Sequence, residues 1–179
     1  MTKIISKKLG VTFMQLQENE IEILEIIENN GRLPVETIAK LVGKNVDEVE
    51  TIIRKLEELK IIVEYNTIVD WKKVAGHEGV TAMIDVKVTP KKGVGFDEIA
   101  KRIYHFKEVK SVYLMSGAYD LSVVIEGKTM SEVGSFVSEK LSILDSVLST
   151  TTHFILKKYK HDGTIFDQGE DDKRIVVTP

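Results

Sequence analysis

Residues 18–62 carry hydrophobic residues at the spacing of amphipathic helices, in three stretches that turn signals separate. The first stretch, residues 18–30, ends at an Asn-Gly pair, and the second begins near Pro34 and is stopped by Gly43. The third begins at Asn45 with a capping-box pattern, because Glu48 follows this cap residue three positions later. A tight, glycine-containing turn between two of three packed helices predicts a helix-turn-helix, a pattern that other three-helix bundles share.

The spacing of the hydrophobic residues changes after these helices. Residues 61–69 alternate between hydrophobic and polar, which predicts a strand, and residues 70–74 predict a short turn of helix. We interpret residues 63–79 as the connecting strand and linker between two domains. Residues 1–17 form an N-terminal extension, and Met14 is an alternative initiator to Met1. Residues 161–179 form a tail with an Asp162-Gly163 turn and an apolar triplet, residues 175–177, that either docks as a strand or stays mobile.

Residues 80–160 follow a different pattern, in which helices and strands are mixed. Residues 80–88 alternate as a half-buried strand does, and residues 97–106 read as a helix. Strands are expected at 109–115, 119–126 and 147–158, and a second capping box, Thr129 to Glu132, opens a helix before the last of them. The order β-α-β-β-α-β is that of the ferredoxin-like fold, so the fold class is α+β. Two helices cover one sheet face, and we expect a second copy of the chain to cover the other.

Composition narrows the classes of protein that remain. The 179 residues are 42% hydrophobic and 30% charged, as in ordinary globular proteins, and no apolar run reaches the roughly 18–20 residues of a membrane helix. Cysteine is absent, which excludes disulfides, thiolate metal sites and cysteine nucleophiles and fits a cytoplasmic protein. The four histidines show no metal-binding spacing, and Gly93-Val94-Gly95 lacks the context of a nucleotide fingerprint. We therefore expect neither a metal nor a cofactor.

The helix-turn-helix part of the chain carries the negative charge. Residues 1–66 contain nine Lys/Arg and twelve Asp/Glu, a balance of −3, whereas residues 67–179 contain sixteen of each. The net charge of the whole chain, also −3, thus lies in the half that would bind DNA. Any affinity for nucleic acid must then come from a local patch, since bulk charge opposes it.

Specific residues make the chain similar to the leucine-responsive/asparagine regulator (Lrp/AsnC) family over about residues 18–160. They include the helical stretches 21–32 and 38–43, and in the second domain the run Ser116-Gly117-Ala118-Tyr119-Asp120-Leu121 resembles the family's Gly-x-Tyr/Phe-Asp turn. Thr150-Thr151-Thr152 resembles its Thr-x-Thr pattern on the final strand. The resemblance implies a transcription regulator whose first domain binds DNA. Its second, called RAM (regulation of amino-acid metabolism), is expected to form dimers and rings of dimers.

The resemblance also implies a small effector, usually an amino acid, bound where RAM domains of neighbouring dimers meet. A glycine-rich turn exposes backbone N–H groups to a carboxylate, and Asp120 suits an ammonium group. Thr150 and Thr152 lie two apart on a strand, so their hydroxyls share a face. The expected effector-binding residues are therefore Ser116, Gly117, Tyr119, Asp120, Thr150 and Thr152. A plain hairpin turn and ordinary β propensity would explain the same residues.

The third helix, the expected recognition helix, is acidic. Residues 44–60 hold four Lys/Arg and five Asp/Glu, and Ile52 stands where the family commonly has arginine. Base contacts are expected from Asn45, Glu48 or Thr51, because glutamate accepts a hydrogen bond from cytosine N4. Phosphate contacts are expected from Arg32, Lys40, Lys44, Arg54 and Lys55. For each residue the alternative is an ordinary solvated surface position.

Two other functions stay open on the sequence. One is a metabolite-sensing module whose helix-turn-helix no longer binds DNA, which the acidic third helix favours. The other is a sirohaem decarboxylase, an enzyme built on the same two-domain plan. Its carboxylate-rich substrate would need several arginines, whereas Arg102 is the single arginine between residues 80 and 160. A ligand-responsive, DNA-binding regulator that is not an enzyme is the function we expect.

Overall fold

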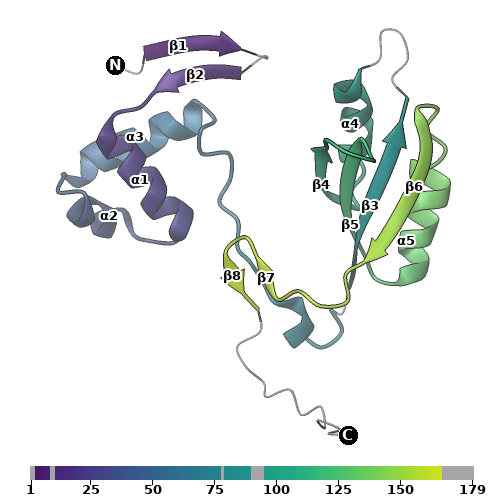
Figure 1. Cartoon of the computed structure of the whole chain (residues 1–179). Helices are drawn as coiled ribbons and strands as arrows, with labels where there is room; N and C mark the ends of the chain where they lie inside the picture. The colour runs from purple at the N-terminus through teal and green to yellow at the C-terminus, as the bar shows by residue number, and fades with distance from the viewer. Residues whose placement is uncertain (1–2, 9–10, 78, 90–94, 167–179) are drawn as a thin grey trace, which may run out of the picture. The chain divides into compact units, whose positions relative to one another are not determined.

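The computed structural model describes residues 3–8, 11–77, 79–89 and 95–166. The chain divides into two compact units, residues 1–67 and 68–179 (Figure 1). The first unit opens with an antiparallel hairpin of β1 (Lys3–Lys8) and β2 (Val11–Gln15), which the sequence did not predict. Three helices follow, α1 (Glu18–Asn29), α2 (Val35–Leu41) and α3 (Val46–Glu58).

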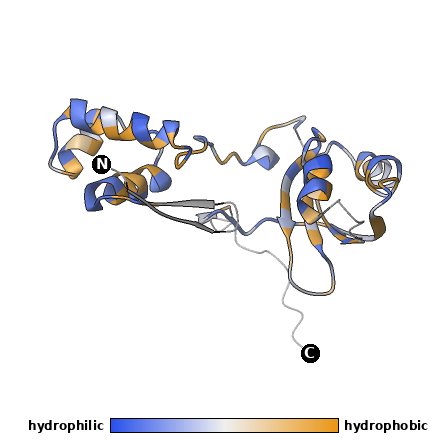
Figure 2. Ribbon diagram, turned by 90° about the horizontal axis from the view of Figure 1, so that it is seen from above, coloured by the Kyte–Doolittle hydropathy of each residue, from blue (hydrophilic) through white to orange (hydrophobic). Residues whose placement is uncertain are grey.

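The three helices confirm the predicted helix-turn-helix. Their shared core is made of Ile23 from α1, Ile38 and Ala39 from α2 and Val49 from α3, all buried. The turn between α2 and α3 depends on Gly43, whose φ of 64° lies in the left-handed region that glycine adopts without strain. Hydrophobic and hydrophilic residues alternate along each helix, as expected for amphipathic helices that bury one face (Figure 2).

The strand predicted at residues 61–69 is wrong. Lys60 takes a positive φ of 55°, and the N–H groups of Ile61 and Ile62 both donate to the carbonyl of Leu56, so these residues complete the end of α3. Ile62 then enters the core, while Tyr65 lies against Gly31. Within the described residues, no strand pairs with this segment through backbone hydrogen bonds. The alternating pattern therefore reflects these separate side-chain contacts. The short helical turn predicted next is present at Trp71–Lys73.

The second unit is built on a four-stranded antiparallel sheet in the order β4-β5-β3-β6. Its strands are β3 (Val80–Val88), β4 (Val109–Leu114), β5 (Leu121–Gly127) and β6 (Val147–Phe154). Helix α4 (Phe96–Tyr104) joins β3 to β4, and helix α5 (Met130–Phe136) with a wider helical turn, Val137–Leu141, joins β5 to β6. The predicted ferredoxin-like fold is thus confirmed.

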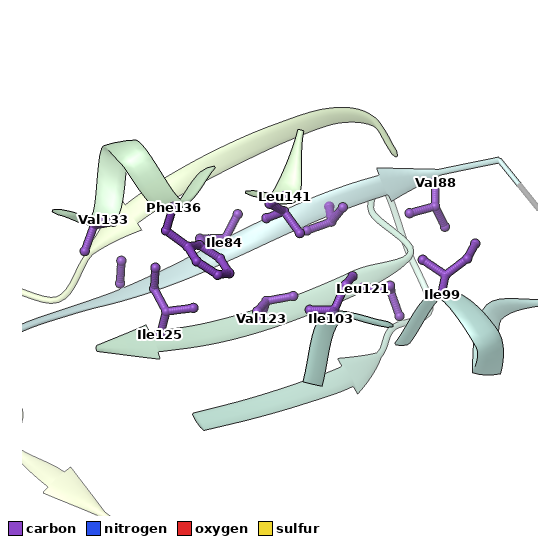
Figure 3. Close-up of a cluster of buried hydrophobic side chains, with 12 residues drawn as sticks. Ile84, Val88, Ile99, Ile103, Leu121, Val123, Ile125, Val133, Phe136 and Leu141 are labelled. Atoms are coloured by element: carbon purple, nitrogen blue, oxygen red, sulfur yellow. The ribbon is translucent and has the colours of Figure 1, made fainter. Parts of the chain in front are cut away.

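One face of the sheet and the two helices enclose the core of this unit. Buried side chains of β3 and β5 meet those of α4, α5 and the wider turn, as Figure 3 shows; they include Ile84, Val123, Ile103, Phe136 and Leu141. The capping box at α5 is present, because the Thr129 hydroxyl accepts a hydrogen bond from the Glu132 N–H at 3.1 Å. The last strand ends at Phe154, earlier than predicted, where its pairing with β3 stops at Ala82.

The described chain ends in a small hairpin of β7 (Lys160–His161) and β8 (Thr164–Ile165). The predicted Asp162-Gly163 turn connects the two strands, and both residues take positive φ, 42° and 78°. Two such residues form the type of tight turn that suits a hairpin. The apolar triplet at residues 175–177 lies outside the described residues.

Candidate functional site

The start of α3 uses the polar groups of two predicted base-contacting residues for its own structure. Asn45 caps the helix, since its side-chain oxygen accepts a hydrogen bond from the Glu48 N–H at 2.8 Å. The Thr51 hydroxyl donates to the carbonyl of Asp47 at 2.7 Å. Glu48 is exposed, and no hydrogen bond or ion pair of its carboxylate is found within the described residues. Of the three candidates, Glu48 therefore has the least engaged side chain.

Lys55 forms an ion pair that the sequence did not predict. Its ammonium group hydrogen-bonds to a carboxylate oxygen of Glu20, a residue of α1 that is 3% exposed. The other oxygen of Glu20 accepts from the Gln17 N–H at 2.9 Å. Burial would raise the pKa of Glu20, but the hydrogen bonds from Lys55 and Gln17 and the charge of Lys55 bring it below its usual value. Lys55 thus ties α3 to α1.

The remaining predicted phosphate-contacting residues are spread over the helices and turns of the first unit. Arg32, Lys40 and Arg54 are exposed, and Lys44 is half-buried in the turn before α3. These four cations stand against a strongly acidic background, because residues 14–66 contain six Lys/Arg and twelve Asp/Glu. The exposed side of α3 also presents Asp47, which is not among the predicted DNA-contacting residues. A carboxylate in the first turn of a helix also interacts favourably with the helix dipole.

Tyr65 and Gly31 hold the end of this unit in place. A Cβ atom at Gly31 would lie 3.2 Å from the Tyr65 ring, so glycine leaves room for that ring. The Tyr65 hydroxyl donates to Glu57 at 2.9 Å. Burial, together with the hydrogen bond and the charge of Glu57, raises the pKa of Tyr65 to about 12. Segment 61–65 is thereby fixed against the helices.

In the second unit, Asp120 fastens the predicted effector turn to the end of β3. One of its carboxylate oxygens accepts from the Val88 N–H at 2.9 Å and lies 3.7 Å from the Lys87 ammonium group. Lys87 also donates to the carbonyl of Ala118 at 3.0 Å. Gly117 has a φ of 147°, which favours glycine, and the turn residues 116–118 are exposed. The contacts of Ala118 and Asp120 therefore anchor the turn to β3, while residues 116–118 remain exposed.

The three threonines of β6 divide between the two faces of the sheet. Thr150 and Thr152 pair with Val86 and Ile84, which are buried under the helices, so both threonines lie on the helix-covered side. Thr151 pairs with Asp85 on the other face, where its hydroxyl hydrogen-bonds to the Tyr119 hydroxyl at 2.9 Å. Thr150 and Thr152 do share a face, as predicted. The threonine in contact with the turn, however, is Thr151.

A groove of the second unit lies at the opposite end of the sheet from this turn. It encloses about 1530 Å³ between the start of β3, the ends of β5 and β6 and the segment around Trp71. None of the six predicted effector-binding residues lines it. In the described part of the chain no group of three or more His, Asp or Glu side chains is placed to hold a metal ion. No described helix is both long and apolar enough to cross a membrane.

A helix-turn-helix unit followed by a βαββαβ unit defines the class of two-domain, DNA-binding regulators. A model described as "Winged helix-turn-helix DNA-binding" matches residues 16–63, and one described as "Lrp/AsnC ligand binding domain" matches residues 81–165. The chain is 69% identical over 166 residues to the uncharacterized HTH-type transcriptional regulator YugG of Bacillus subtilis, covering 93% of this chain and all of that protein. It is 30% identical to the HTH-type transcriptional regulator FL11 of Pyrococcus horikoshii, covering 81% and 92% of the two chains.

Solved structures show the same fold. The Neisseria meningitidis transcriptional regulator NMB0573, in complex with L-Met, has a TM-score of 0.67 at 24% identity, covering 82% of this chain and 94% of that one. Escherichia coli AsnC has a TM-score of 0.64 at 18% identity, covering 82% and 96%.

The chain belongs to the Lrp/AsnC family. It is a transcriptional regulator with a DNA-binding helix-turn-helix and a ligand-binding domain, which confirms the function predicted from the sequence. Its curated relatives are named as regulators, so the decarboxylase alternative is set aside.

Proposed function

We propose that this regulator binds duplex DNA through α3 and its surroundings, and that an amino acid bound at the turn of residues 116–121 controls that binding. The observation that carries the proposal is this turn, whose accessible backbone adjoins the half-buried carboxylate of Asp120. The complex of the related fold NMB0573 with L-Met supports an amino acid as the effector. A regulator of DNA acts where the DNA is, so we place the protein in the cytoplasm.

The turn offers matching groups to both ends of an amino acid. The exposed N–H groups at Ser116 and Gly117 suit a carboxylate, because glycine allows close approach of the backbone. Asp120 keeps its second carboxylate oxygen for an ammonium group, since the Val88 N–H occupies only one. The Tyr119 ring, half-buried and tied to Thr151, would border the side chain of the effector. Thr151 takes the place of the predicted Thr150 and Thr152 in this proposal, because those two lie on the helix-covered side of the sheet.

We further propose that the sheet face opposite the helices joins two copies of the chain. Met83 and Tyr113 lie on this face and are 41% and 54% exposed. Large hydrophobic side chains exposed together on one face mark a surface that a partner can cover. Burying this face in a homodimer would cover them and would bring two effector turns into one assembly. A ring of such dimers would complete the effector site between neighbouring RAM domains.

A melting screen against the twenty amino acids tests the effector site. At least one amino acid is expected to raise the melting temperature of the wild-type chain, because ligands that bind only the folded state stabilise it. Asp120→Asn retains an acceptor for the Val88 N–H but loses the charge, so the shift should disappear. Asp97→Asn, an exposed residue in the first turn of α4, is the matched control and should keep the full shift. An undiminished shift in Asp120→Asn would place the effector elsewhere.

Footprinting on the DNA upstream of the protein's own gene tests the regulator function. Protection is expected at low salt and should change when the effector found in the screen is added. The competing candidate, a metabolite-sensing module without DNA affinity, is favoured by the excess of twelve acids over six cations in residues 14–66. No protection under any of these conditions, together with an intact thermal shift, would establish that candidate instead.

A further inference from the structure

We infer that the recognition helix selects cytosine, and that the carboxylate of Asp47 is the group that reads it. This inference rests on the proposed DNA binding through α3. It starts from the exposed stripe of α3, on which Asp47, Thr51, Arg54 and Glu58 recur every three or four residues. The stripe lies opposite the buried residues Val49 and Leu56, so it is the side of the helix that can enter a major groove.

The structure engages three polar side chains of α3 and its cap within the protein, while Arg54 of the stripe stays exposed. Lys55 is turned to Glu20 in α1, and the Asn45 side-chain oxygen is used as the helix cap. The Thr51 hydroxyl hydrogen is given to the carbonyl of Asp47. Two exposed carboxylates remain in the first turn, where recognition helices meet base edges, those of Asp47 and Glu48. Asp47 lies on the stripe, whereas Glu48 lies about 100° around the helix from it. No hydrogen bond or ion pair of the Asp47 carboxylate is found in the described part of the chain.

A carboxylate in the major groove discriminates among the four bases mainly by repulsion. Cytosine presents the N4 amino group, a donor with no acceptor beside it on the same base. Adenine places its N7 acceptor next to the N6 donor, and guanine and thymine present acceptors alone. A carboxylate accepts only hydrogen bonds, so it meets lone pairs on each of these three bases. Asp47 therefore favours cytosine and disfavours the rest, and specificity arises as much from the excluded partners as from the chosen one.

The charge of α3 fits this mode of recognition. Its exposed carboxylates are repelled by phosphates, so they stabilise a complex only where a base donor meets them. The exposed cations Arg32, Lys40 and Arg54 remain to contact phosphates, which fixes the position of the helix without reading sequence. A regulator of this kind binds weakly to random DNA and gains its affinity at matching sites.

Selection from a random duplex library by the full-length protein tests the inference. Wild type should enrich a cytosine at one position of each half-site, and replacing that cytosine should weaken binding about tenfold. Asp47→Asn should change the enriched base to adenine, because an asparagine side chain pairs with adenine N6 and N7. Asp47→Glu should keep cytosine, which preserves a readout if the asparagine variant folds poorly. Circular dichroism checks folding of each variant.

Glu58→Gln provides the matched control. It removes one negative charge from the same stripe, roughly 16 Å along the helix from Asp47 at about 1.5 Å per residue. Its affinity should rise for all sequences alike, while the enriched cytosine stays. An enriched motif that Asp47→Asn leaves unchanged would overturn the inference and leave the proposed DNA binding intact. Absence of binding by wild type at low salt would instead refute the proposed function.

Discussion

Replacing Lys55 by methionine tests whether its ion pair with Glu20 holds the helix-turn-helix together. Glu20 has a side chain that is 5% exposed, so removing Lys55 leaves a buried carboxylate with one hydrogen bond, from the Gln17 N–H. Breaking a buried pair in this way costs about 3–5 kcal/mol. Lys55 itself is 34% exposed, which means that water reaches the pair and lowers the expected loss to about 2–3 kcal/mol.

Hydrogen exchange of the full-length chain measures this loss within the unit concerned. Amides of α1 and α3 should exchange about 30- to 150-fold faster in Lys55→Met, the ratio that 2–3 kcal/mol corresponds to. Amides of β3 and β5, in the other unit, serve as the internal reference. Lys40→Met, an exposed cation in α2, is the control and should change exchange by less than about fivefold. Equal protection in Lys55→Met and Lys40→Met would refute the structural role of the pair.

The same pair predicts an acid-labile unit. Its hydrogen bonds and charge lower the pKa of Glu20, so the carboxylate binds a proton less readily in the folded than in the unfolded state. The contribution to stability is therefore present above the unfolded pKa, about 4.5, and is lost as pH falls through the folded value. In Glu20→Gln the protection of α1 should be lower at neutral pH and should decline less between pH 5 and 3 than in wild type.

Three further predictions concern single contacts. Absorbance titration should place the Tyr65 phenol near pH 12, and Glu57→Gln should lower that midpoint, because it removes the charge beside the hydroxyl; an unchanged midpoint would contradict the contact. Gly117→Ala should lower the melting temperature of the second unit, since alanine is strained at a φ of 147°, although open space surrounds the position. Thr129→Ala should destabilise the same unit by about 1 kcal/mol in a denaturant titration through loss of the cap on α5, and a change below about 0.3 kcal/mol would rule the cap out.

Local signals in the sequence were enough for most of the fold. Gly43, Asn45 and Thr129 each mark a helix boundary by a mechanism that acts within a few residues, and the structure places a boundary at each. The alternation over residues 80–88 likewise reports burial of one face of β3. The same reasoning failed at residues 61–69, where it predicted a strand that the structure does not contain. Ile62 and Tyr65 are ordered by contacts with residues that the local period does not encode.

The candidate sites were less predictable, because they depend on pairings between distant residues. Thr151, rather than Thr150 or Thr152, contacts Tyr119, which follows from the register of β6 against β3 and not from the threonine pattern. Lys55 was predicted to contact a phosphate, because its partner Glu20 lies 35 residues away in the sequence and a local pattern does not reveal the pair. One signal was available: Gln17 and Glu20 have the spacing of a capping box, which would have shown Glu20 turned towards the helix start.

These contacts show which acidic residues of the helix-turn-helix unit serve the fold and which face solvent. Glu20 serves the fold, since it holds Lys55 and caps α1, so neither charge of the pair is available to DNA. The exposed acids that remain weaken phosphate binding and leave few favourable contacts besides cytosine amino groups. With few cations neutralising phosphates, the slope of log affinity against log salt should be shallow. Each of Arg32→Ala and Arg54→Ala should reduce it by about one if that arginine contacts a phosphate. A steep slope that neither arginine changes would show that DNA is bound through another part of the chain.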